Sequence, residues 1–268
     1  MINIALYKKE FKRNLILFLI FLGLILLYGA IVSAMFDPNV DNLSWIQSLQ
    51  DLYPELLDFI GFNFAEITDY QYFISGYLYG MLFILFGIIY ANIISSRLIY
   101  RYIDQGSIVF LLSTPNSRKK VLLTQIFVVQ TYLFLLALSM FLVTSLFGEI
   151  FNPGYVDFGK LFYLNLSFFI LLSFISSLMI LCHSIFEGKK ALGFSIGLPV
   201  LFFFLNLITN LGNTYKFVVY FTPFSLFDPI LCINYSGLSF IYNGLLILLT
   251  LSTFGITIFY FNKRDLSV

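Results

Sequence analysis

The sequence predicts an all-α integral membrane protein with six transmembrane helices. Of its 268 residues, 60% are hydrophobic and 11% are charged, and the mean hydropathy is +0.93. Soluble domains carry about 25% charged residues, so this chain lacks the polar residues needed to coat a globule in water. This composition excludes a water-soluble enzyme and a disordered chain, and a net charge of +1 argues against a nucleic-acid binder.

Six apolar runs provide the second observation. A helix needs about 20 apolar residues to cross a hydrocarbon core of about 30 Å. Each run is continuously apolar, without the period-two alternation of barrel strands, and holds no Asp, Glu, Lys or Arg in its interior. The predicted crossings are 15–34, 73–94, 121–147, 161–182, 192–211 and 238–261. We expect one transmembrane domain that covers residues 1–268.

The distribution of basic residues predicts the orientation. Only Lys160 and Lys216 lie in the first, third and fifth loops, so the other thirteen of the fifteen Lys and Arg lie in the leader, the even-numbered loops and the tail. Basic residues collect on the cytoplasmic side of membrane proteins. Both termini are therefore expected in the cytoplasm.

The basic leader, residues 1–14, precedes the first crossing. It mixes apolar residues with Lys8, Lys9, Lys12 and Arg13, which predicts a short helix on the cytoplasmic membrane surface. A plain positive-inside anchor is the alternative. A cleavable signal peptide would give a similar pattern, but the apolar run is long for one and the leader contains Glu10.

The first outer loop is acidic and contains no Lys or Arg. Residues 43–60 fit an amphipathic helix with Asp51, Glu55 and Asp58 on its polar face. One interpretation places this helix in the outer membrane interface. The other makes its acidic face the lining of an outer vestibule that attracts a cationic substrate.

Two further connections have unusual compositions. The inner loop 95–120 begins with charged residues, continues with the apolar residues 108–112 and ends in turn residues, which suits a docking surface for a cytosolic partner. Residues 212–237 are too apolar for a water-exposed loop and are broken by Pro223 and Pro229. They predict a re-entrant outer hairpin, whose backbone would be buried by protein.

Motifs for catalysis and for ligand binding are missing. The sequence has no G-x-x-x-x-G-K-S/T phosphate loop and neither G-x-S-x-G nor H-E-x-x-H. Cys182 and Cys232 do not form a disulfide framework, and His183 has no partner at metal-ligand spacing. The crossings also lack the carboxylates of ion-driven transporters. We therefore expect no catalytic residue, metal site or cofactor on this chain.

Four segments resemble the type-2 ABC-transporter permease family, the transmembrane subunits of bacterial ABC exporters. One lies before the first crossing, one before the third, one before the sixth and one at the end of the chain. They are LYKKEFKR at 6–13, LLSTPNSR at 111–118, PFSLFDP at 223–229 and YFNKRDL at 260–266. Each is weakly specific, but all four occur in the family's order.

The resemblance implies a separate cytosolic ATPase that binds ATP and Mg. It implies that Tyr100 to Thr114 form the coupling helix, which sits in a cleft of that ATPase. The residues implied in coupling are Tyr100, Arg101, Asp104, Gln105, Ile108, Leu111, Leu112, Thr114 and Arg118. Two permeases, identical or related, and two ATPases would form the working unit in the bilayer. The path would lie between the permeases, capped by the first outer helix and residues 214–235.

The predicted function is therefore the permease subunit of an ATP-driven exporter in the bacterial plasma membrane. The 34 Phe and 18 Tyr suit an amphipathic or hydrophobic cargo. An antimicrobial peptide is the first choice, because the outer loop is acidic, and a lipid or drug is the next. The alternative function is a stand-alone immunity or sequestration protein that binds a toxic peptide without an ATPase.

Overall fold

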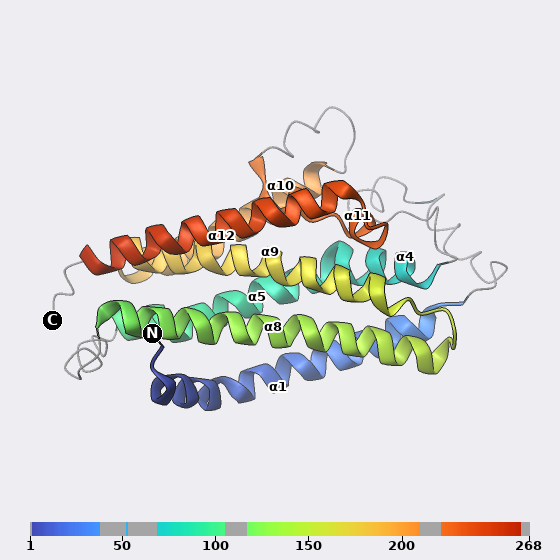
Figure 1. The fold of residues 1–268 in the computed structure, drawn as a ribbon, viewed down its shortest axis with the longest axis horizontal. Coiled ribbons are helices and arrows are strands. Elements are labelled where there is room, and N and C mark those ends of the chain that lie inside the picture. The colour runs from blue at the N-terminus through green and yellow to red at the C-terminus, as the bar shows by residue number, and fades with distance from the viewer. Residues whose placement is uncertain (1, 38–51, 53–68, 105–116, 210–220, 264–268) are drawn as a thin grey trace.

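The computed structural model describes residues 2–37, 52, 69–104, 117–209 and 221–263, which form a bundle of long helices lying side by side (Figure 1). Six helical stretches are long and apolar enough to cross a membrane. They are Ile4–Met35, Tyr70–Asp104, Arg118–Phe151, Phe158–Ile185, Gly188–Ile208 and Gly237–Lys263. The predicted all-α fold with six spanning helices is confirmed.

The second of these stretches is the most irregular. It consists of α4 (Tyr70–Ile74), the π-helix η3 (Ser75–Leu82), α5 (Phe83–Ser95), the π-helix η4 (Ser96–Tyr100) and α6 (Arg101–Asp104). The other spanning helices are α1 (Ile4–Met35), α8 (Arg118–Phe151), α9 (Phe158–Ile185), α10 (Gly188–Thr209) and α12 (Gly237–Lys263). Each predicted crossing lies within one of these stretches, except that residues 210 and 211 lie outside the described part.

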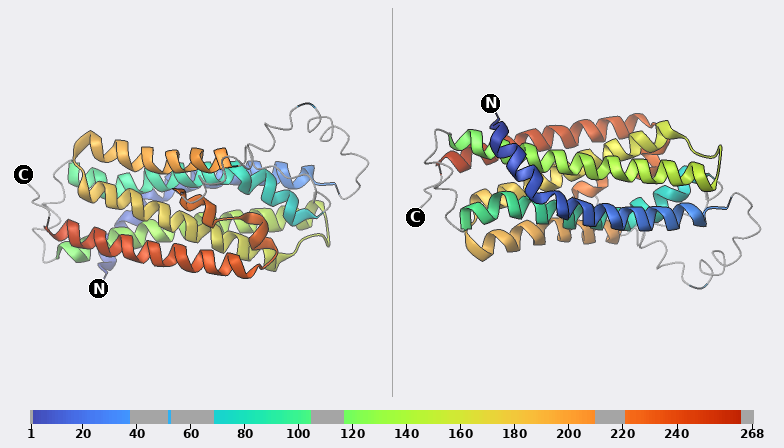
Figure 2. Two further views of the ribbon diagram at one scale, coloured as in Figure 1. Left: turned by 90° about the horizontal axis from the view of Figure 1, so that it is seen from above. Right: turned by 90° about the horizontal axis from the view of Figure 1, so that it is seen from below.

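The basic residues of the described structure gather at one end of the bundle axis. Helices α1, α8 and α10 begin at one end, where α6, α9 and α12 terminate (Figures 1 and 2). Every described Lys and Arg except Lys160 lies in the element termini gathered there. We call this the basic end. This gathering of basic residues matches the two-sided pattern in the sequence, whereas the assignment of the basic end to the cytoplasm stays a prediction.

Polar side chains determine where several helices begin. Asn3 accepts a hydrogen bond from the Leu6 amide at 3.1 Å and caps α1. Asp157 accepts from two amides at the start of α9, at 3.0 and 3.1 Å. Ser117 caps α8 in the same way. These caps satisfy amides that have no partner within the helix.

The leader and the first crossing form one continuous helix, α1, because no Pro or Gly interrupts the chain between them. The first turns are inclined to the rest of α1 (Figure 2). The buried side of the helix packs on α8, where Gly29 leaves room for Val143. Residues 4–14 thus begin the same helix as the first span, whereas their position on a membrane surface stays a prediction.

Helix α9 forms the centre of the bundle. In its most apolar window 72% of the residues are buried, against 28% in α1, α10 and α12. It packs on α12 through short polar side chains. Asn243 donates to the Ser167 hydroxyl at 2.7 Å, and the Ser177 and Thr253 hydroxyls lie 2.5 Å apart. Such hydrogen bonds join helices where water is absent.

The connection before α12 folds back against the bundle. It contains the short 3₁₀ helix η6 (Pro223–Leu226) and α11 (Pro229–Ile233), which pack on α9, α10, α12 and η3. Phe224 and Ile233 are fully buried there. The two prolines begin the two short helices, as their fixed φ favours. Re-entry of this segment into a membrane stays a prediction.

Candidate functional site

The predicted coupling residues lie only partly within the described structure. Gln105, Ile108, Leu111, Leu112 and Thr114 fall outside it, as do the vestibule residues Asp51, Glu55 and Asp58. Tyr100 ends η4, Arg101 and Asp104 bound α6, and Arg118 begins α8. The structure therefore describes the two flanks of the predicted coupling helix. Both flanks are at the basic end.

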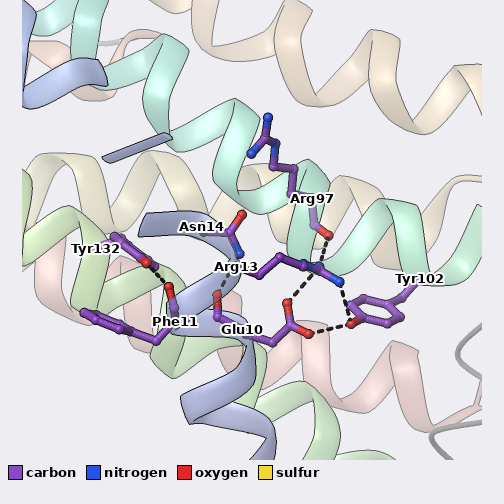
Figure 3. A network of polar contacts seen from close by, with 7 residues as sticks. All are labelled: Glu10, Phe11, Arg13, Asn14, Arg97, Tyr102 and Tyr132. Atoms are coloured by element: carbon purple, nitrogen blue, oxygen red, sulfur yellow. Dashed lines mark hydrogen bonds and ion pairs between the residues drawn. The ribbon is translucent and has the colours of Figure 1, made fainter. Parts of the chain in front are cut away.

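A buried carboxylate lies beside the first flank. Glu10 of α1 is 0% exposed. Its Oε2 forms an ion pair with an Arg13 guanidinium nitrogen at 2.7 Å, and its Oε1 accepts a hydrogen bond from the Tyr102 hydroxyl at 2.5 Å (Figure 3). The other Arg13 nitrogen donates to the same hydroxyl at 3.0 Å. Glu10, Arg13 and Tyr102 thus form a closed triad that joins α1 to α6.

The triad satisfies the physical demands of a buried charge. A carboxylate taken out of water loses its hydration, and the loss is tolerable only when charged or hydrogen-bonding groups replace it. Arg13 supplies the opposite charge, and its side chain remains 39% exposed. The guanidinium also lies 5.3 Å from the centre of the Tyr102 ring and donates to the Arg97 carbonyl at 3.4 Å. Removal of either partner would leave Glu10 poorly compensated.

The opposite side of the leader is fixed to α8. The Phe11 and Tyr132 rings stack with centroids 5.0 Å apart, and the Tyr132 hydroxyl donates to the Phe11 carbonyl (Figure 3). Nearer the N-terminus, the Asn3 amide donates to the Thr124 hydroxyl at 2.9 Å. The beginning of α1 therefore lies between α8 and α6, with polar contacts to both.

A small, partly open pocket lies beside Tyr102 and is bordered by η4, α6, α8 and α12. Its lining residues are Leu98, Ile99, Tyr102, Val121, Leu122, Gln125 and Phe261. Gln125 is 3% exposed, and neither atom of its carboxamide has a hydrogen-bond partner among the described residues. A mostly apolar pocket is therefore bordered by one residue whose buried amide is unsatisfied.

Tyr100 and the turn before it are attached to α9. The Tyr100 and His183 rings lie 5.5 Å apart, and the Ser96 hydroxyl lies 3.4 Å from Nε2 of His183. The flank that carries Tyr100 is thus held by α1 on one side and by α9 on another.

Sequence reasoning did not identify Glu10, Tyr102 or Gln125 as site residues. Glu10 was recognisable as the one acidic residue in a basic leader, which is an unusual place for a negative charge. Tyr102 and Gln125 carry no such signal, because tyrosine and glutamine occur throughout the chain. Their roles depend on how the second and third spanning stretches pack.

Comparison with known proteins bears on this arrangement. The family model described as ABC-2 family transporter protein matches residues 4–266. Searches of the curated proteins and of the solved structures gave no match. The match covers all six spanning helices and the triad at the basic end. The chain therefore belongs to the ABC-2 transporter family, as its motifs predicted, and is a transmembrane subunit of an ABC transporter.

Proposed function

We propose that this chain is the permease subunit of an ATP-driven exporter in a bacterial plasma membrane. The family match over residues 4–266 carries the proposal. The sequence has no phosphate-binding loop of its own, which suits a subunit powered by a separate cytosolic ATPase. ATP and Mg would bind to that partner and not to this chain.

The basic end is the proposed site of coupling to the ATPase. Closure of two ATPases around ATP would push the segment from Tyr100 to Thr114. The described flank of this segment is well suited to receive such a force, because the Glu10 triad attaches it to α1 and Tyr100 contacts His183 of α9. Movement of the flank would thus reach one helix at the edge of the bundle and another at its centre.

The exposed apolar faces support a two-permease assembly in lipid. Helices α1, α10 and α12 are mostly unburied in their apolar windows, so lipid or a second permease must cover them. In the proposed working unit, two permeases and two ATPases assemble, with the path between the permeases. The first outer helix and residues 214–235 would cap this path on the outside.

The proposed cargo is an amphipathic or hydrophobic molecule, with a cationic antimicrobial peptide as the first choice and a lipid or drug as the next. The acidic outer loop supports the peptide. Exchange of Asp51, Glu55 and Asp58 together for Asn, Gln and Asn should lower cellular resistance to cationic peptides while resistance to neutral drugs stays the same. Unchanged peptide resistance would disprove the acidic vestibule.

Co-purification tests the central proposal. The tagged chain, extracted from its native membrane in mild detergent, should carry an ATP-hydrolysing subunit in about equal amount. Leu111→Asp should remove that subunit and stop export, whereas Leu111→Ile should retain both. Wild-type chain that purifies without an ATPase, together with full function of Leu111→Asp, would contradict the permease and favour a stand-alone immunity protein.

A further inference from the structure

Tyr102 is near two polar groups, the Glu10–Arg13 pair, which has hydrogen-bond partners, and the Gln125 carboxamide, which has none among the described residues. Its hydroxyl donates to Glu10 and accepts from Arg13. Its side chain also borders, together with Gln125, the small pocket between η4, α6, α8 and α12. Both carboxylate oxygens of Glu10 have a partner, Tyr102 or Arg13. The Gln125 carboxamide has no hydrogen-bond partner within the described chain.

The unpaired carboxamide of buried Gln125 lowers the stability of the described conformation. A buried amide without a partner loses its hydration and gains nothing in return. Gln130, five residues further along the same helix, shows the ordinary solution, because its amide donates to the Ser176 hydroxyl at 3.0 Å. An amide left unpaired in one conformation suggests a conformation in which it is paired.

The turn that carries Tyr102 has the irregularity needed for movement. It follows the π-helix η4, and π-helical turns store one extra residue relative to an α-helix. Tyr102 and Gln125 border the same small pocket between this turn and α8. The second conformation therefore requires the turn to move toward α8, across this pocket.

We propose that Tyr102 is a two-position contact, bonded to the Glu10–Arg13 pair in the described conformation and to Gln125 in a second one. Force on the adjoining coupling segment would drive the exchange. The leader would thereby be released from α6 at the moment when the coupling segment moves. Glu10, Arg13 and Gln125 are then positioning residues for coupling, and this inference rests on the proposed function.

The first test separates stability from transport. Gln125→Leu replaces an unpaired amide by an apolar group of similar size, so the melting temperature of the isolated chain should stay the same or rise. ATP-driven export should nevertheless fall about tenfold, the loss expected for one hydrogen bond in the second conformation. Gln130→Leu is the matched control, and it should lower the melting temperature by about 2–4 °C and keep export.

The second test determines whether the effect of Gln125 on export depends on the Tyr102 hydroxyl. Tyr102→Phe removes the hydroxyl, so Gln125→Leu should reduce export no further in that background. Multiplied effects of the two substitutions on export would overturn the proposal, as would full export by Gln125→Leu.

The described position of Tyr102 has its own test in the isolated chain. Glu10→Gln and Tyr102→Phe should each raise the unfolding equilibrium constant. The double variant should fall about tenfold short of the product of the two single effects, because both substitutions break the same charge-assisted bond. Independent effects would overturn the proposal, even where the ATPase co-purifies. Absence of the ATPase together with full function of Leu111→Asp would instead refute the proposed function, and the stability measurements would still test the contact between Tyr102 and Glu10.

Discussion

Substitution of Gly148 by alanine should destabilise the end of the bundle opposite the basic end. An added Cβ would lie 2.5 Å from both the hydroxyl oxygen and Cζ of Tyr70. Tyr70 is 0% exposed. Its hydroxyl donates to the Thr144 carbonyl at 2.6 Å and, since its one proton is used there, accepts from the Ser33 hydroxyl at 2.9 Å. The phenol is therefore held in place and cannot retreat without breaking bonds to two helices.

The expected cost follows from these contacts. Overpacking of a filled core costs about 1–3 kcal/mol, and displacement of the phenol weakens two hydrogen bonds that contribute about 1 kcal/mol each. Replacement of a helical glycine by alanine returns about 1 kcal/mol. We expect Gly148→Ala to lower the free energy of unfolding by about 2–3 kcal/mol.

Thermal unfolding read by a thiol-reactive dye measures this change, because Cys182 and Cys232 are both free and buried. Gly193→Ala on α10 is the control, since no described atom lies within 4 Å of the added Cβ, and it should be neutral or slightly stabilising. In a Tyr70→Ala background Gly148→Ala should cost nothing. An equal cost in both backgrounds, or wild-type stability of Gly148→Ala, would refute the reasoning.

Two other substitutions test the packing around α9 and α11. Asn243→Leu removes the bonds to the Ser167 and Tyr163 hydroxyls, at 2.7 and 3.1 Å, and should cost about 1 kcal/mol in denaturant unfolding; no loss would show that the α9–α12 interface does not depend on them. Burial raises the pKa of the Cys232 thiol from 9.0 to about 11. In a Cys182→Ser chain its alkylation at pH 8 should therefore be about 100-fold slower than after unfolding and should rise with pH up to about 11. Equal rates in folded and unfolded chain would contradict this burial.

The sequence predicted the spanning helices well because each is a long apolar run, and membrane length is a strong constraint. It predicted the leader less fully. The Lys residues suggested a membrane surface, but the side of the helix that carries Glu10 and Asn14 is buried in the protein. Amphipathic spacing cannot distinguish a face turned to lipid headgroups from one turned to other helices.

The triad could not be derived from the sequence, because 92 residues separate Glu10 from Tyr102 and their contact depends on tertiary packing. The polar contacts between α9 and α12, in contrast, leave a regular spacing in the sequence of α12. The buried residues Ser239, Asn243, Leu246, Thr250, Thr253 and Thr257 alternate in steps of four and three along α12, which is the spacing of a helix seam. That seam was readable in advance, although its partner helix was not.

The π-helix η4 fixes the angular phase of every residue that follows it in the second span. One residue more in a turn rotates the rest of the helix by about 100° relative to a regular α-helix. Tyr102 faces Glu10 in this phase. Deletion of a single residue within Ser96–Tyr100 would keep the span apolar and long enough for a membrane. It would nevertheless turn the phenol away from the carboxylate, so chain length in this turn is as much a part of the site as the side chains themselves.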